Sequence, residues 1–149
     1  MLVGYKINMV TLNDFHRLAG ETIMYCQCIE RDIKLIYVDM LQGDFDENFQ
    51  EIEDRSLGSV LKKLEKLDNS DANLHLSTGD YAMIDKIRDI RNHWAHKAHV
   101  QFVYSKNSSY DKNHLQQYRR LENDRNRLAK LSDGIENVRF DALRKYNRI

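Results

Sequence analysis

The chain has 149 residues, with 23 basic and 23 acidic side chains and no formal net charge. This length suits one compact domain, and a hydrophobic fraction of 42% supplies enough apolar side chains for a core. The balanced charge excludes disorder caused by net charge, and it argues against capture of nucleic acid by overall charge alone. No apolar run approaches the roughly 18 residues of a membrane span, and the N-terminus lacks the pattern of a secretory signal. We therefore expect a soluble cytoplasmic protein without a membrane partner.

Charge is unevenly distributed along the chain. Residues 1–54 carry 4 basic and 11 acidic side chains, residues 55–105 carry 8 and 6, and residues 106–149 carry 11 and 6. The basic C-terminal third could contact the phosphates of RNA. It could equally form a solvated helix face or pair with the acidic first third, so these interpretations stay open. The arginines concerned are Arg119, Arg120, Arg125 and Arg127.

The first half of the chain is predicted to be helical. Proline is absent and glycine occurs only six times, so little interrupts helical backbone. A long helix is expected to start after Thr11 or Asn13, either of which can cap it, and to end near Gln42. Its apolar residues recur every three or four positions, which is the period of a helix rather than of a strand. A turn of helix is expected around Phe49, and a shorter second helix over Ser56–Leu67.

Two further helices complete the predicted fold. A polar stretch over residues 68–79 predicts a loop. The third helix is expected from about residue 80 to about Tyr104, where the segment over residues 105–111 ends it, and the last over about residues 113–146. Four main helices joined by short loops favour an all-α, up-and-down bundle. We expect a single domain over residues 1–149, with a core that covers about residues 12–146.

Two charged residues fall inside apolar helix stripes. Arg91 lies within the apolar arc of the third helix, and Glu30 interrupts the arc of the first. Such residues are rarely buried unless they are paired, so we expect Glu30 to meet Arg91. The pair could simply fix the register of two helices. Alternatively, Glu30 could orient Arg91 toward an anionic ligand such as a phosphate, and periodicity does not separate these interpretations.

The residues after Arg91 could support phosphate chemistry. Asn92 and His96 share a helix face, whereas Arg91 and His96 lie about 140° apart on an ideal α-helix. A helix irregularity, the long arginine side chain or a second protomer could bring the three together. A guanidinium binds phosphate through its planar fork, and a histidine can transfer a proton while a ribose 2′-hydroxyl attacks the adjacent phosphate. RNA supplies its own nucleophile, so this chemistry needs neither a metal ion nor a cofactor.

At these residues the chain resembles the HEPN superfamily of helical-bundle proteins. The hallmark of that family is an arginine, four to six intervening residues of which the first is usually polar, and then a histidine. Arg91 and His96 have the four-residue spacing, and Asn92 is the polar residue. The motif also comes after the Ser56–Leu67 helix, and Glu30 supplies an acidic residue in the long first helix. The resemblance covers most of the chain.

The resemblance implies a metal-independent endoribonuclease, often a toxin or an anti-phage defence effector. Members usually dimerise so that two Arg–His motifs form one composite site in the interface cleft. Carried over to this chain, Arg91 would bind phosphate, His96 would be the acid or base, and Asn92 would support them. Glu30 and His93 would be supporting residues. The implied partners are an RNA substrate, a second copy of the chain and an antitoxin protein.

A second hypothesis is a catalytically silent HEPN-like module that binds RNA or protein. Silent members of the family exist, and they would share the same helical bundle. Some members that are paired with a nucleotidyltransferase antitoxin also carry a tyrosine two residues after the motif histidine, where it is modified. Ala98 stands at that position, so this mode of control does not follow from the resemblance.

A third hypothesis is a metal-dependent enzyme. Asp89, His93 and His96 could share a helix face and bind a transition metal, although no second cluster in the sequence supplies further ligands. His93 is otherwise expected to be an ordinary residue of the polar face. Trp94 lies in the apolar arc, so we expect it to pack in the core or an interface, with base stacking as the alternative.

Overall fold

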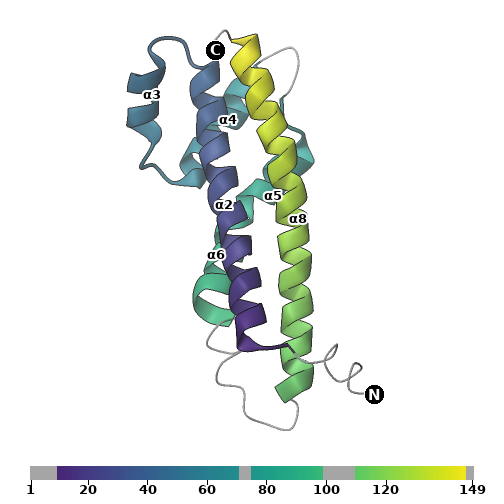
Figure 1. The fold of residues 1–149 in the computed structure, drawn as a ribbon. Coiled ribbons are helices and arrows are strands. Elements are labelled where there is room, and N and C mark those ends of the chain that lie inside the picture. Colours follow the sequence, from purple (N-terminus) through teal and green to yellow (C-terminus); the bar gives the residue numbers. More distant parts are fainter. Residues whose placement is uncertain (1–9, 71–74, 99–109, 147–149) are drawn as a thin grey trace. The chain divides into compact units, whose positions relative to one another are not determined.

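The protein is described by a computed structural model that places residues 10–70, 75–98 and 110–146, with only the backbone described for residues 110–113. All regular structure in these ranges is helical, which confirms the all-α class and is consistent with a helical bundle. None of the helices in the described ranges is long and apolar enough to cross a membrane. In chain order (Figure 1) the elements are α2 (Leu12–Met40), α3 (Phe45–Ile52), α4 (Leu57–Asn69), α5 (Thr78–Asp85), α6 (Ile87–Asn92), the π-helical turn η1 (His93–Lys97) and α8 (Tyr110–Lys145).

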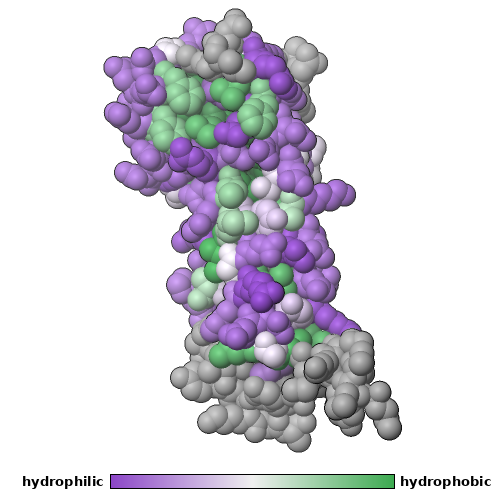
Figure 2. Space-filling model, in the orientation of Figure 1, coloured by the Kyte–Doolittle hydropathy of each residue, from purple (hydrophilic) through white to green (hydrophobic). Residues whose placement is uncertain are grey.

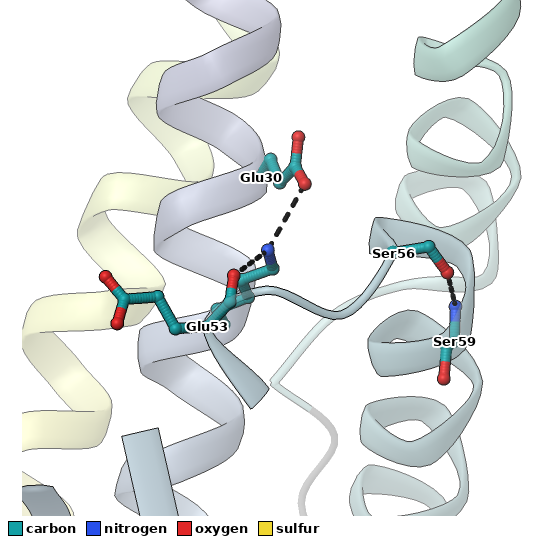
Figure 3. A network of polar contacts seen from close by, with 5 residues as sticks. Glu30, Glu53, Ser56 and Ser59 are labelled. Carbon is teal, nitrogen blue, oxygen red and sulfur yellow. Dashed lines mark hydrogen bonds and ion pairs between the residues drawn. The ribbon is translucent and has the colours of Figure 1, made fainter. Parts of the chain in front are cut away.

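Short polar side chains begin two of these helices, and the cap of the first at Thr11 is one of the two that the sequence predicts. The N–H of Asp14 donates to Thr11 Oγ1 at 3.1 Å, and the N–H of Thr11 donates to Asp14 Oδ2 at 3.2 Å. This reciprocal cap satisfies two backbone donors at the start of α2. The Ser56 hydroxyl accepts from the N–H of Ser59 at 3.3 Å and caps α4 through this single hydrogen bond (Figure 3).

The continuous helix predicted from about residue 80 to about residue 104 is wrong over residues 80–98, and its remainder lies outside the described residues. A helix does begin there, because Ser77 and Asp80 cap α5 reciprocally through their side chains and backbone N–H groups. It ends after one or two turns, and the N–H of Lys86 donates to carbonyls of the preceding turn. The short α6 and then η1 come next. The motif residues therefore lie in two consecutive short elements rather than in one long helix.

Contacts between residues divide the chain into two compact units. Unit 1 comprises residues 1–26 and 89–129, and unit 2 comprises residues 27–88 and 130–149, each described only within the ranges that the structure places. Both long helices, α2 and α8, contribute residues to both units. The single domain expected over residues 1–149 stays a prediction.

Unit 1 is built around one buried tryptophan. Trp94 of η1 is 1% exposed, and its ring lies 6.3 Å from the ring of Phe15 in α2 at an interplanar angle of 60°. Tilted aromatic pairs at this separation are favourable beyond the area that they bury. The buried members of this cluster are Phe15, Leu18, Ala19, Trp94, Ala98 and Leu121.

Unit 2 has an aliphatic core. Ile33 of α2, Leu64 of α4 and Ile84 of α5 are all completely buried. Each belongs to the three- or four-residue apolar repeat of its own helix, so the sequence periodicity and the buried faces agree. On the face drawn in Figure 2, hydrophobic side chains also gather on the part of unit 2 that carries α3. Other buried residues of this core are Ile29, Ile36, Val38, Val60 and Ile135.

A buried carboxylate connects α4 to α5 in unit 2. Asp68 is completely buried, and its Oδ1 accepts from the N–H of His75 at 2.8 Å. Its Oδ2 accepts from the N–H of Leu76 at 3.1 Å and from the hydroxyl of Tyr81 at 2.7 Å. Burial, together with the hydrogen bond to Asp68, raises the pKa of Tyr81, so the phenol remains a donor. The sequence predicts Asp68 at the start of a loop, whereas the structure makes it the acceptor that two backbone N–H groups and a phenol share.

Candidate active site

The motif histidine lies within a π-helical turn that begins two residues after the motif arginine. The helix α6 ends at Asn92, and residues 93–97 form η1, where the N–H of Ala98 donates to the carbonyl of His93. This hydrogen bond joins residues five apart, rather than the four of an α-helix. Turns of this kind are rare and occur frequently at functional sites. The irregularity that could bring the motif residues together is thus present.

The π turn changes which residues share a face. Residues 93–96 lie in the wider π turn, where each residue rotates by less than the 100° of an α-helix. Arg91 and His96 are therefore separated by less than the angle of about 140° in an ideal α-helix. Arg91 and Asn92 are half-buried, and His96 is exposed. The guanidinium, the amide and the imidazole therefore belong to one helical segment of unit 1, with the histidine open to solvent.

Trp94 anchors this segment to α8. Its Nε1–H donates to Asp124 Oδ2 at 2.7 Å, and Asp124 is 7% exposed. The other carboxylate oxygen of Asp124 pairs with Arg127. Trp94 therefore packs in the core, as expected, and its buried ring is not a platform for stacking a base. Asp124 is absent from the site residues predicted from the sequence, although it interrupts the apolar repeat of α8 just as Arg91 and Glu30 interrupt theirs.

His93 occupies a partly buried position beside Trp94. The two rings meet edge to face, with centroids 4.6 Å apart and an interplanar angle of 81°. Burial lowers the pKa of His93, the positive charges of Arg120 and Lys97 lower it further, and the carboxylate of Asp124 opposes them. His93 is therefore more than the ordinary polar-face residue expected from the sequence, because it contacts the anchor of the segment.

The arginines of α8 have different environments. Arg125 Nη1 lies 3.2 Å from Glu21 Oε1, so one member of the basic final helix pairs with the acidic first third of the chain. Arg127 pairs with Asp124 within α8. The Arg120 guanidinium lies 5.9 Å from the centroid of the Trp94 ring, and Arg119 is exposed. Pairing with the acidic first third therefore applies to Arg125, whereas Arg119 lies on a solvated face of the helix.

Glu30 belongs to unit 2 and forms an ion pair there. Its carboxylate lies 3.3 Å from the ammonium group of Lys34, and Lys34 is 8% exposed. The same ammonium donates to the backbone carbonyl of Glu53 at 2.7 Å (Figure 3). Glu30 thus helps to hold the turn after α3 against α2. Arg91 lies in unit 1, and the predicted pairing of Glu30 with Arg91 stays a prediction.

The metal site considered from the sequence is not assembled. Within the described ranges, no three His, Cys, Asp or Glu side chains are placed to hold a metal ion. Asp89 and His96 are both exposed, and His93 packs against Trp94 instead of joining them. The chemistry of the segment is therefore that of its guanidinium, amide and imidazole groups.

No protein-family model, curated protein or solved structure matches the chain. A guanidinium can hold a phosphate group, an amide can hydrogen-bond to it, and an exposed imidazole can transfer a proton.

Proposed function

We propose that the protein is a metal-independent endoribonuclease of the HEPN type. The observation that carries this proposal is the π turn that follows Arg91 and contains His96. In a regular α-helix the four intervening residues would direct these two side chains away from each other. A turn of five residues reduces that separation, so that one phosphate group can be reached by both.

The motif side chains have distinct roles in the proposed reaction. Arg91 binds the scissile phosphate and stabilises the charge that develops on it, and Asn92 supports this contact. The ribose 2′-oxygen loses its proton and attacks the phosphorus, and the bond to the 5′-oxygen breaks. His96, which is exposed, transfers a proton in this step. The products are a 2′,3′-cyclic phosphate and a 5′-hydroxyl.

The cellular setting follows from the same resemblance. We propose an up-and-down HEPN-like topology and a homodimer with a composite site, acting in the cytoplasm as a toxin or defence effector that an antitoxin protein restrains. Light scattering at micromolar concentration tests the dimer directly. A monomer at that concentration would contradict the composite site.

The experiment compares cleavage of a mixed-sequence RNA in EDTA by the wild type, Arg91→Ala and His96→Ala. We expect His96→Ala to lose about 100-fold or more of the rate, because general acid–base catalysis contributes at least that much. Arg88→Ala, an exposed arginine one turn before Arg91, is the matched control and should cleave like the wild type. Thermal unfolding of each variant confirms that the chain is folded.

The products distinguish the proposal from its main alternative. Fragments that end in 2′,3′-cyclic phosphate from the wild type and Arg88→Ala support the ribonuclease. A folded wild type that cleaves no RNA at any pH contradicts it and favours the catalytically silent module that binds RNA or protein. Cleavage that survives in both motif variants would show that another site is responsible.

A further inference from the structure

Two side chains that can carry positive charge, His93 and Arg120, lie beside Trp94 in unit 1, and the charge of Lys97 acts on the same His93. Arg120 of α8 lies 5.9 Å from the centroid of the Trp94 ring, and His93 of η1 meets the same ring edge to face at 4.6 Å. Lys97 lies four residues after His93, which is close to one π turn. Two helical elements, η1 and α8, thus bring these groups to one place.

The charged side chains near His93 carry a net positive charge, because two of them are cations and one is a carboxylate. Arg120 and Lys97 both lower the pKa of His93, while Asp124 alone raises it. Asp124 already accepts from Trp94 and pairs with Arg127. Arg120 and Lys97 are exposed, and neither forms an ion pair with another residue in the part of the chain that the structure describes.

Such an arrangement suits an anion. Two exposed cations beside an imidazole repel one another, and an anion that they share would relieve this repulsion. A guanidinium binds a phosphate through parallel hydrogen bonds, and an ammonium binds it as a point charge. Protonated His93 would add a further donor to the same ligand.

We propose that Lys97, Arg120 and His93 bind a second phosphate group of the RNA strand, separate from the phosphate held by Arg91 and His96. The inference rests on the proposed function for the identity of the strand. His93 and Lys97 share one side of η1, and His96 lies on another, so the two groups of side chains serve different phosphates. Arg120 is then a binding residue and has no part in proton transfer.

Reciprocal linkage provides a readout that does not require cleavage. A phosphate that binds better when His93 is protonated must raise the pKa of His93. This pKa is measurable from the imidazole resonances by NMR, and the His93→Asn variant identifies which resonance belongs to His93. The probes are inorganic phosphate and a 2′-O-methyl hexauridylate, which lacks the nucleophile and stays intact.

Two variants distinguish a specific role of Arg120 from the general effect of losing one positive charge. Arg120→Ala removes the guanidinium beside Trp94, and Arg119→Ala removes an exposed charge from the adjacent position of the same helix. We expect both probes to raise the pKa of His93 in the wild type and in Arg119→Ala, and to lose this effect in Arg120→Ala. Lys97→Ala should reduce the rise in the pKa of His93 that the probes cause. If Arg120→Ala does not fold, Lys97→Ala serves as the test variant instead.

Several outcomes would overturn the inference. No change in the pKa of His93 with either probe excludes a phosphate at this place. A response in Arg120→Ala equal to that of the wild type shows that the anion binds elsewhere. If inorganic phosphate raises the pKa of His93 but the oligonucleotide does not, the site binds free phosphate, and RNA is excluded as its ligand.

Kinetics separate this inference from the proposed function. If the wild type cleaves RNA, Arg120→Ala should raise KM about threefold and leave kcat unchanged, which corresponds to one exposed charge contact. An unchanged KM would contradict the inference while the ribonuclease stands. A chain that shows the pKa response but cleaves no RNA would contradict the ribonuclease and retain the phosphate site.

Discussion

The two units use buried and exposed charge in opposite ways. In unit 2 both oxygens of the buried Asp68 accept hydrogen bonds, from two backbone N–H groups and the Tyr81 hydroxyl. In unit 1 the exposed Lys97 and Arg120 surround a partly buried His93. A polar group whose partners all lie within the chain stabilises the fold, whereas charge directed to solvent is available to a ligand.

Asp124 shows that both uses occur within unit 1. It is buried, it accepts from Trp94 Nε1, and it pairs with Arg127. Its bonds hold η1 against α8, and on its neighbouring turn Arg120 remains exposed. The fixed carboxylate therefore positions the π turn, while the nearby Arg120 keeps its charge exposed to solvent.

The largest effect is expected from Asp68→Ala, which breaks the satisfied network of unit 2. The two backbone N–H groups and the Tyr81 hydroxyl lose their acceptor, and each buried unsatisfied group costs about 1–3 kcal/mol. We expect the free energy of unfolding, measured in urea, to fall by about 3 kcal/mol or more. Asp85→Ala, which removes an exposed carboxylate from α5, is the control and should change little. Equal stability of the two variants would refute the structural role of Asp68.

A smaller loss is expected from Trp94→Phe, which keeps an aromatic ring in the core of unit 1. The substitution removes the Nε1 donor and leaves one oxygen of the buried Asp124 without its partner. We expect about 1–2 kcal/mol of lost stability in the same urea measurement. Asp124→Asn should cost less than Asp124→Ala, because an amide oxygen can still accept from Trp94. If Trp94→Phe is as stable as the wild type, this hydrogen bond does not anchor the π turn.

His93 should contribute a pH-dependent effect. The pKa of His93 in the folded chain is lowered from the ordinary value of 6.5. At a pH between the lowered pKa and 6.5, the unfolded chain therefore binds more protons than the folded chain. Stability is therefore full above about pH 6.5 and decreases as the pH falls toward the lowered pKa. His93→Asn should lose this part of the pH dependence. Arg120→Ala should raise the pKa of His93 in NMR titration, and a fall would contradict the repulsion inferred between them.

The smallest effect is expected from Asp141→Ala on α8 in unit 2. Its carboxylate lies 2.7 Å from Arg144, but both side chains are largely exposed, at 68% and 65%. Exposed pairs of this kind contribute about 0–1 kcal/mol. The thermal midpoint should barely change, and a loss comparable to that of Asp68→Ala would mean that exposure does not distinguish the two carboxylates.

The sequence predicts most of the helices because their signals are local. The apolar repeats, together with the cap at Thr11, place α2 and α4 close to their observed bounds. The break between α5 and α6 occurs at Lys86, where neither proline nor glycine marks it. The π turn likewise depends on the packing of Trp94 against α8, which no local pattern encodes.

The candidate site was only partly predictable for the same reason. The spacing of Arg91, Asn92 and His96 is visible in the sequence, but the hydrogen bond from Trp94 to Asp124 joins residues 30 positions apart. Asp68 looks like a loop residue because its donors lie beyond it across a polar stretch. Long-range hydrogen bonds of this kind select one conformation among several that the local sequence allows.

The π turn also makes η1 a place where the chain length can change. A π turn is equivalent to an α-helix that has accepted one additional residue between fixed ends. Removal of Ala95 would let the segment return to α-helical backbone with Trp94 still against α8. The same deletion in the middle of α8 would rotate every later residue by about 100° and misplace its buried face. Deletion of a single residue should therefore be tolerated at residues 93–97 more readily than within α2 or α8.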